Sequence, residues 1–354
     1  MVHRDRSGDL LANPRRTVMG AIAAVGIVGL GTAGGFALTG LRGVAAARCV
    51  VGVDLLGTAA TSASRLEGRV SDQLGALERA APLDLVIVST STPDHPETAV
   101  AILCGAHPPA RLWIDKPMAA TRDGHAQIRK APGGPGVRVL LHMAFAAEVL
   151  WATEHVARWR DLHGRIAKIV CDFNDPYADV AQVRAAALAD SWSDSGINAL
   201  SVIARLAHLD HLIEAMGTRP LHTCASFAMH DGELEGQCLI KTAWTPSNAR
   251  KTTTLHFEDG TAVTLDHQYA TVTVADRCGR TLDVQRLGRR PLGNRYAAMF
   301  ASYATEDSLP FSTEAEDSLH GHLHAVTEEL ERASCARLGR LTPRPATRYR
   351  ELHE

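Results

Sequence analysis

A glycine-rich turn near the start of the sequence is the first group of residues that could bind a ligand. It spans residues 29–34 (GLGTAG) and follows the apolar run Ala24–Val28. In a G-x-G-x-x-G turn the first glycine permits a tight bend, the second lets the backbone approach a pyrophosphate, and the third lets the following helix pack closely. The N–H groups at the start of that helix then face the phosphates. The pattern predicts dinucleotide binding, with an ordinary glycine-rich turn as the alternative.

Asp54 extends this pattern. It lies 20 residues after Gly34 and ends the second apolar run, Arg48–Val53. A carboxylate at this point suits the ribose hydroxyls of NAD and repels the 2′-phosphate of NADP. We therefore expect NAD as the cofactor, and NADP remains an alternative because the preference rests on Asp54 alone.

Two further clusters follow later apolar runs. Ser89–His95 (STSTPDH) comes directly after Asp84–Val88, and residues 115–117 (DKP) come directly after Arg111–Ile114. Ligands of open α/β sheets bind at the carboxyl ends of the strands, so both clusters could lie at a cofactor site. Burial and a cationic nicotinamide would lower the pKa of Lys116 and make it a proton-transfer partner. The alternatives are a strand-to-helix turn and a surface lysine.

The fourth cluster, residues 194–198 (DSGIN), precedes a predicted helix over Asn198–Ala215. Asp194 and Asn198 both fall near the first turn of that helix. They would face one cavity if this end of the helix points at the edge of the sheet. The alternative is that Asp194 or Ser195 caps the helix.

The elements that must position these clusters are strands and helices in alternation. Five apolar runs without polar alternation predict strands that are buried on both faces, as in a parallel sheet covered by helices. Residues 21–142 therefore predict an α/β domain of the Rossmann type, with a doubly wound parallel sheet. The runs are Ala24–Val28, Arg48–Val53, Asp84–Val88, Arg111–Ile114 and Val137–Leu141.

The sequence changes character after His142. Residues 143–338 predict an α+β domain with an open, mostly antiparallel sheet. A strand is expected over Arg165–Phe173, and two hairpins have turns at residues 258–261 (EDGT) and 276–279 (DRCG). A capping box, Thr313-x-x-Glu316, predicts a helix that runs to about Ala336. Residues 1–20 are expected to form a polar extension and residues 339–354 a surface tail.

Composition argues against several classes of protein. The formal net charge is −2, which argues against a nucleic-acid-binding chain and against a polybasic membrane-surface protein. The seven cysteines include no C-x-x-C pair and predict reduced, mostly buried thiols in a cytoplasmic protein. Residues 17–41 carry no charge before Arg42 and follow Arg15-Arg16, a pattern that also fits an export signal or a membrane span. We favour the strand and the glycine-rich turn over that alternative.

Two histidine pairs have spacings that can bind zinc, His320 with His324 and His208 with His211. No third ligand has a diagnostic spacing, so we expect no metal. The sequence also contains no nucleophile elbow and no phosphate-binding P-loop.

In their order and spacing, the four clusters resemble those of the Gfo/Idh/MocA family (glucose–fructose oxidoreductase / inositol dehydrogenase). The resemblance spans about residues 24–335 and implies an oxidoreductase of CH–OH groups with a Rossmann domain, an open-sheet domain and a nicotinamide cofactor. The sequence departs from the family at Asp115, where glutamate is usual, and at Asn198, where a histidine is often assigned as the acid/base. Asparagine cannot take a proton. The cofactor-binding residues that the resemblance implies are Gly29, Gly31, Thr32, Ala33, Gly34, Asp54, Thr90, Thr92, His95, Asp115 and Lys116.

Two stretches are similar to aldose 1-dehydrogenases that act on D-galactose and L-arabinose, residues 194–201 (DSGINALS) and 141–149 (LHMAFAAEV). This similarity implies the catalytic residues Lys116, Asp194 and Asn198. Lys116 and Asp194 would bracket the reacting hydroxyl, either of them taking its proton, and Asn198 and His142 would hold neighbouring hydroxyls. The product would be a lactone. Asn174, Arg184 and Trp192 are further candidate substrate contacts by position alone.

Two other functions stay open. One is reduction of a keto-sugar or an imine in a biosynthetic pathway, and the other is a sensor that binds a dinucleotide or a sugar without turnover. A non-catalytic binder has no need of Lys116 at the hydride site. The expected partner is a small sugar-like molecule, and the chain is expected to form a homodimer or homotetramer through residues 239–284. The exposed face of that region should then be unusually apolar.

Overall fold

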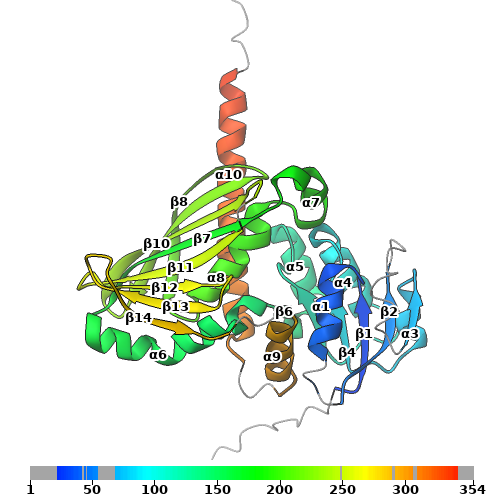
Figure 1. Ribbon diagram of the computed structural model, residues 1–354. Helices are drawn as coiled ribbons and strands as arrows, with labels where there is room; N and C mark the ends of the chain where they lie inside the picture. The colour runs from blue at the N-terminus through cyan, green and yellow to red at the C-terminus, as the bar shows by residue number, and fades with distance from the viewer. Residues whose placement is uncertain are drawn as a thin grey trace, which may run out of the picture.

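The protein consists of two β-sheets with their helices, lying side by side, as the computed structural model in Figure 1 shows. The structure describes residues 22–341 except 42–43, 45, 55–67, 248, 289–291 and 306–308. The expected extension 1–20, with Arg15-Arg16, lies outside the described residues, as do the last residues of the expected tail. Among the described residues, no helix combines the length and the apolar character needed to cross a membrane.

The first sheet is six-stranded and fully parallel, in the order β3-β2-β1-β4-β5-β6. All four residues of β4 and all four of β5 are buried, because helices cover both faces of the sheet. This confirms the doubly wound α/β fold predicted from the sequence. Its strands are β1 (Ala24–Val28), β2 (Arg48–Val53), β3 (Arg69–Ser71), β4 (Leu85–Val88), β5 (Leu112–Asp115) and β6 (Arg138–Leu140); its helices are α1 (Thr32–Leu41), α3 (Gly75–Arg79), α4 (His95–Leu103) and α5 (Arg122–Lys130).

The second sheet is eight-stranded and open, in the order β14-β13-β12-β11-β7-β10-β9-β8. Every neighbouring pair is antiparallel except β10 and β7, which are parallel. The predicted open, mostly antiparallel sheet is therefore confirmed. Its strands are β7 (Ile166–Asp175), β8 (His208–Thr218), β9 (His222–Asp231), β10 (Leu234–Trp244), β11 (Arg250–Phe257), β12 (Ala262–Asp266), β13 (Thr271–Ala275) and β14 (Thr281–Arg286).

In the described part of the chain, five more helices follow β6, and α9 and α10 both pack against the first domain. They are α6 (Ala147–His163), α7 (Ala181–Leu188), α8 (Ile197–Ile203), α9 (Leu292–Thr305) and α10 (Thr313–Leu341). Helix α9 packs against α1, where a Cβ on Gly40 would lie 2.8 Å from Cβ of Tyr296. Helix α10 contacts α5 and β6 as well as β8, and its C-terminal part extends past the sheet in Figure 1. Helices α9 and α10 thus pack against the first domain, although they follow the second sheet in the sequence.

The helix predicted over Asn198–Ala215 is wrong beyond Ile203, because β8 begins at His208. In β8, Leu209 pairs with Met229 and Leu212 pairs with Phe227 of β9. Three steps along β8 therefore span two steps along β9, which is a β-bulge. The bulge places residues three apart on the same face of the sheet, a spacing that is otherwise typical of a helix.

The predicted capping box at the start of α10 is also wrong. The Oγ of Ser312, not of Thr313, accepts a hydrogen bond from a helix N–H group, that of Ala315, at 3.2 Å. The Glu316 side chain is fully buried and accepts a hydrogen bond from Arg138 Nη2 of β6 at 2.7 Å. Glu316 thus forms an ion pair that holds α10 against β6 of the first sheet, and it is not part of a capping box.

The outer face of the second sheet carries threonine at its centre. Thr254, Thr264 and Thr273 lie in one row across β11, β12 and β13, and the Oγ1 atoms of Thr254 and Thr264 are 3.1 Å apart. The apolar residues that alternate with these threonines along each strand, such as Leu255, lie on the inner face and are buried. Leu282 and Val284 of β14 are also exposed, so the outer face over residues 239–284 is mixed and is not the unusually apolar face that we expected.

All seven cysteines are free thiols, and they are not mostly buried as expected. Cys49, Cys171 and Cys238 are buried, whereas Cys104, Cys278 and Cys335 are exposed.

Candidate active site

The glycine-rich turn lies at the carboxyl end of β1 and opens α1. Gly29 has a φ of +88°, and a Cβ there would lie 2.4 Å from the carbonyl oxygen of Ser89. A Cβ on Gly34 would lie 2.0 Å from the carbonyl oxygen of Gly29, so only glycine fits either position. A Cβ on Gly31 would meet nothing within 4 Å, and Gly31 and Thr32 are exposed. An open backbone beside a helix N-terminus fits a dinucleotide pyrophosphate.

Asp54 lies beside this turn. It follows the last residue of β2, Val53, whose carbonyl oxygen accepts the N–H of Gly29 at 2.8 Å. The N–H of Asp54 itself donates to the carbonyl oxygen of Ser71 at the end of β3, and the residue is largely buried. The structure thus brings the predicted ribose-binding carboxylate next to the predicted phosphate-binding turn.

His95 connects the two clusters that follow β4 and β5. Its Nδ1 lies 2.9 Å from the carbonyl oxygen of Pro117, and its Nε2 lies 3.1 Å from that of Thr90. Burial lowers the pKa of His95, and the nearby Asp115 opposes this only in part. His95 and Thr92 are both buried, whereas Thr90 is half-buried. Because both ring nitrogens face backbone carbonyls, His95 holds the loop in place.

Lys116 and Asp194 form a buried ion pair between the two domains. Lys116 Nζ lies 2.6 Å from Asp194 Oδ1 and donates to the Asp194 carbonyl oxygen at 2.7 Å. The two side chains are only 9% and 11% exposed. The fold thus brings together residues 78 positions apart, on the edge where β1, β4 and β5 end.

The charges of this pair support each other. Burial alone lowers the pKa of Lys116, but Asp194 and Asp115 outweigh burial and raise it above its usual value. The lowered pKa expected for Lys116 depended on a cationic nicotinamide as well as on burial, and the protein groups alone raise the pKa of Lys116 instead. Burial alone would raise the pKa of Asp194, yet Lys116 and Lys251 hold it below its usual value. The pair is an ammonium next to a carboxylate.

Tyr296 of α9 belongs to the site, although no motif around it indicated this role. Its hydroxyl donates to Asp115 Oδ1 at 3.2 Å, and its ring stacks on His142, with centroids 5.2 Å apart and an interplanar angle of 14°. Burial, followed by the nearby Asp115, raises the pKa of Tyr296. Burial, followed by Lys116 and Arg295, holds the pKa of His142 well below its usual value, so the ring is neutral.

Three buried polar atoms near the ion pair lack a hydrogen-bond partner among the described residues. They are Asn198 Oδ1, His142 Nδ1 and Trp244 Nε1. Asn198 Nδ2 donates to the Asp194 carbonyl oxygen at 3.1 Å, which places the side chain beside the pair. The Trp244 indole lies close enough to Asp194 to lower the pKa of that carboxyl, although it does not reach hydrogen-bond geometry. Buried polar groups without partners call for a ligand or water.

A π-helical turn, Trp192–Gly196, carries Asp194, and such turns are frequent at functional sites. The Trp192 ring is fully buried, and its Nε1 donates to the carbonyl oxygen of Leu323 in α10 at 2.9 Å. A Cβ on Gly196 would lie 2.7 Å from the Trp192 ring. Trp192 therefore packs under the turn, and the structure does not support it as a substrate contact.

Asn174 does not join the other predicted site residues. Strand β7 extends to Asp175, and its side chains alternate between the two faces of the sheet. Asn174 pairs with Arg250 and donates to Asp172 Oδ1 at 2.9 Å, on the face opposite the ion pair. The substrate contact predicted for Asn174 is therefore wrong, and its neighbour Asp175 is buried on the side of the site.

Arg184 and Tyr177 lie at the rim of the site. The Arg184 guanidinium is 4.4 Å from the centre of the Tyr177 ring, and that ring meets Trp244 edge-on. Burial raises the pKa of Tyr177, as do the charges of Asp175 and Asp194. Helix α7 contacts the turn Thr92–Asp94 of the first domain. The position predicted for Arg184 near the site is thus consistent with the structure.

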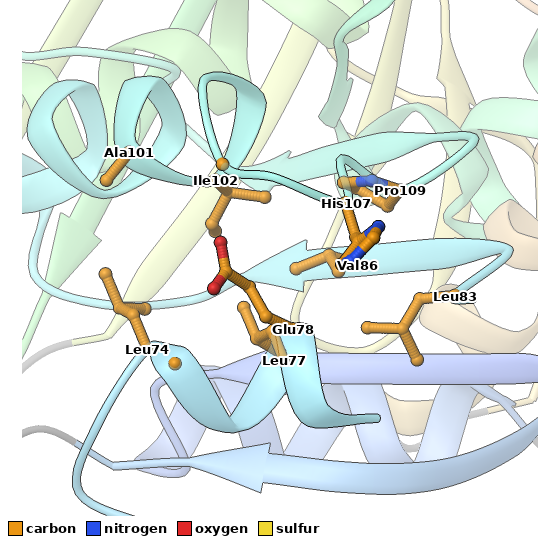
Figure 2. Close-up of a pocket in the computed structure, with 11 residues that line it drawn as sticks. Leu74, Leu77, Glu78, Leu83, Val86, Ala101, Ile102, His107 and Pro109 are labelled. Atoms are coloured by element: carbon orange, nitrogen blue, oxygen red, sulfur yellow. The ribbon is translucent and has the colours of Figure 1, made fainter. Parts of the chain in front are cut away.

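A separate cavity of about 160 Å³ lies in the first domain (Figure 2). It sits at the edge where β4 and β5 begin, because Leu83 and Pro109 line it. Figure 2 shows the Glu78 side chain among apolar neighbours, and its Oε1 accepts the N–H of Ala106 at 3.0 Å. This edge is opposite to the one that carries the ion pair.

The two histidine pairs with zinc-binding spacing lie outside any cluster of three or more potential metal ligands in the described part of the chain. His320 uses both ring nitrogens, with Nδ1 2.8 Å from the Glu316 carbonyl oxygen and Nε2 accepting the N–H of Met118 at 3.0 Å. Within the described ranges, no group of three or more His, Cys, Asp or Glu side chains has an arrangement that could hold a metal ion.

Comparison with known proteins supports the fold. No protein-family model matches the sequence, and no curated protein matches it. GenD2 from gentamicin A biosynthesis, in complex with NAD, matches with a TM-score of 0.69 and 15% identity over 91% of this chain and 97% of that chain. Levoglucosan dehydrogenase, in complex with NADH and levoglucosan, matches with a TM-score of 0.67 and 14% identity over 87% of this chain and 98% of that chain.

A third solved structure agrees with these two. The myo-inositol 2-dehydrogenase from Lactobacillus plantarum matches with a TM-score of 0.67 and 14% identity over 88% of this chain and 98% of that chain. The chain therefore shares the fold of these three proteins over almost their whole length.

Proposed function

We propose that this protein is an NAD-dependent oxidoreductase that transfers hydride between a nicotinamide cofactor and a hydroxyl-bearing carbon of a sugar or cyclic polyol. The observation that supports this most is the buried Lys116–Asp194 ion pair on the strand edge that also carries the Gly29–Gly34 turn. The resemblance to the Gfo/Idh/MocA family agrees with the proposal, as do the NAD complex of GenD2 and the levoglucosan and inositol dehydrogenases that share the fold.

The residues of the first domain fit a dinucleotide. The Gly29–Gly34 turn would hold the pyrophosphate and Asp54 the adenosine ribose. Thr90 and Asp115 lie nearer the ion pair and would face the nicotinamide half. When bound, the nicotinamide ring supplies the hydride acceptor in oxidation and the hydride donor in reduction.

Asp194 and Lys116 have different roles in this proposal. The Asp194 carboxylate accepts the proton of the substrate hydroxyl while the carbon loses hydride, so a carbonyl group remains. The Lys116 ammonium donates a hydrogen bond to the same oxygen and stabilises its developing negative charge. Neighbouring carboxylates raise the pKa of Lys116, which favours Asp194 over Lys116 as the group that accepts the proton. Reduction would reverse each transfer.

The three unpartnered atoms suit a substrate with several hydroxyls. Asn198 Oδ1 accepts a hydrogen bond, Trp244 Nε1 donates one, and the neutral His142 ring offers Nδ1 in either role. Each would gain a partner from a hydroxyl next to the reacting carbon. An apolar alcohol would leave them unsatisfied, which costs about 1–3 kcal/mol for each group.

Oxidation of an aldose at C1 to a lactone is the particular reaction that we favour, on the similarity of residues 141–149 and 194–201 to aldose 1-dehydrogenases. Oxidation of a ring alcohol is the second candidate, since structural neighbours include levoglucosan and inositol dehydrogenases. A panel of aldoses and inositols with NAD or NADP, followed by NADH absorbance and by NMR of the product, distinguishes a lactone from a ring ketone. NADH binding without turnover of any member would favour the keto-sugar or imine reductase.

We also propose a cytoplasmic homodimer or homotetramer. The threonine row on the outer face of the second sheet would then form a polar contact between subunits. Light scattering after size exclusion gives the mass, and a monomer at working concentration would contradict this proposal.

A further inference from the structure

A second ion pair lies next to the first on the substrate side of the site. Lys251 Nζ of β11 is 2.8 Å from Asp175 Oδ1 at the end of β7. The other oxygen of the same carboxylate, Asp175 Oδ2, accepts a hydrogen bond from Ser195 Oγ at 2.6 Å. Ser195 is the residue directly after Asp194 in the π-helical turn. The chain Lys251–Asp175–Ser195 therefore ends at the neighbour of the proposed proton acceptor.

We propose that Lys251 is a positioning residue for Asp194, anchoring the turn that carries it through Asp175 and Ser195 and placing a second positive charge beside its carboxylate. This inference rests on the proposed function of Asp194 as the proton acceptor. The role of Lys251 also fits the asparagine at position 198. Asn198 cannot take a proton, so the site depends on Asp194 remaining ionised.

The geometry of the sheet fixes this arrangement. Lys251 pairs directly with Phe173 of β7, so its side chain lies on the inner face together with those of Phe173 and Asp175. Asp175 is largely buried and uses its two oxygens for two different elements, β11 and the π-helical turn. Lys251 is 26% exposed, which makes it more accessible to solvent than either member of the Lys116–Asp194 pair.

The charges around Asp194 come from several elements. Positive charge comes from Lys116 after β5 and Lys251 on β11, and both lower the pKa of Asp194 against the effect of burial. The other titratable groups that face this cluster are Asp115, Asp175, His142, Tyr177 and Tyr296. Removing the Lys251 charge leaves Lys116 as the main cation opposing burial and the other carboxylates.

Three variants separate the charge of Lys251 from its packing. Lys251→Met removes the charge, and Lys251→Arg keeps it. Lys241→Met is the matched control, because Lys241 of β10 is exposed on the outer face of the sheet, whereas Lys251 lies on the inner face. We expect Lys251→Met to move the acid limb of kcat/KM upward by about one pH unit, with a roughly tenfold loss below that limb. Lys251→Arg should stay within about twofold of the parent, and Lys241→Met should match it.

A measurement without turnover keeps this test apart from the proposed function. The Asp194 carboxyl, labelled with ¹³C and identified by its loss in Asp194→Asn, is titrated downward from pH 8. In Lys251→Met, we expect the Asp194 carboxyl to begin binding a proton at a pH about one unit higher than in the parent protein. In Lys251→Arg, protonation should begin at the same pH as in the parent. Identical titrations in all three would overturn the role of Lys251, whatever the activity. Shifted titrations without activity toward any polyol would uphold it and contradict the proposed function instead.

Discussion

Replacing Lys116 with methionine tests the ion pair at the centre of the site. The charged atoms of Lys116 and Asp194 are 2.6 Å apart, which corresponds to an attraction of about 6 kcal/mol at an effective dielectric constant of roughly 20. Desolvation of both groups offsets much of this gain, since each side chain is about nine-tenths buried. Lys116→Met leaves the Asp194 carboxylate buried without its partner. We expect the free energy of unfolding to fall by about 3–5 kcal/mol at neutral pH.

A double-mutant cycle measures whether this loss comes from the pair. Asp194→Asn alone should also destabilise the protein, because it leaves the Lys116 ammonium unpaired. The double variant, Lys116→Met with Asp194→Asn, should lose less than the sum of the two, with a coupling of about 2–3 kcal/mol. Urea unfolding followed by tryptophan fluorescence provides the three values. Additive losses would show that the two charges do not stabilise each other in the folded state, which would contradict the predicted coupling.

Three further predictions concern other parts of the molecule. Asp54→Gly should shift the ratio of NADH to NADPH affinity toward NADPH by about tenfold, because repulsion of a 2′-phosphate is lost; fluorescence titration with both nucleotides measures it. Gly34→Ala should abolish dinucleotide binding in the same titration, because its Cβ would lie 2.0 Å from the Gly29 carbonyl oxygen. His324→Leu should reduce the acid sensitivity of the fold. Burial, followed by the charges of His125 and Arg122, lowers the pKa of His324 in the folded protein to about 4. As the pH falls, His324 therefore binds a proton in the unfolded chain before it does so in the folded protein. Stability should therefore fall as the pH drops from about 6.5 to 4, and His324 should account for roughly 2 kcal/mol of the loss between pH 7 and 5, measured by urea unfolding at both.

Much of the first domain could be predicted because its signals are local. Strands β4 and β5 are short apolar runs without polar alternation, and the structure buries every residue of both. The Gly29–Gly34 turn has a spacing that steric contact explains, since a Cβ at Gly29 or Gly34 would meet backbone atoms. The pairing of Lys116 with Asp194 was different, because position alone left a surface lysine and a helix cap open. The resemblance to aldose 1-dehydrogenases implied that the two act together, and the fold brings them to 2.6 Å.

The residues that the sequence did not reveal come from distant elements. Tyr296 reaches Asp115 from α9, and Lys251 reaches Asp175 from β11, without any motif in either segment. Asp175 could have been predicted as a site residue from the sequence. If the strand predicted to end at Phe173 is extended by two residues, the alternation of side chains places Asp175 on the same buried face as Phe173. The β8 strand could not have been predicted, since its bulge imitates the spacing of a helix.

NADH binding and turnover in the parent protein and in Asp194→Asn, with whichever polyol of the panel is turned over, test the role of Asp194 in the chemistry. Asp194 is proposed to accept the substrate proton and to make no contact that holds the dinucleotide. We therefore expect the Kd for NADH to stay within about twofold, while kcat falls by roughly 10²–10⁴, the usual contribution of a general base. A variant that retains the parent kcat would show that the Lys116–Asp194 pair does not perform the chemistry.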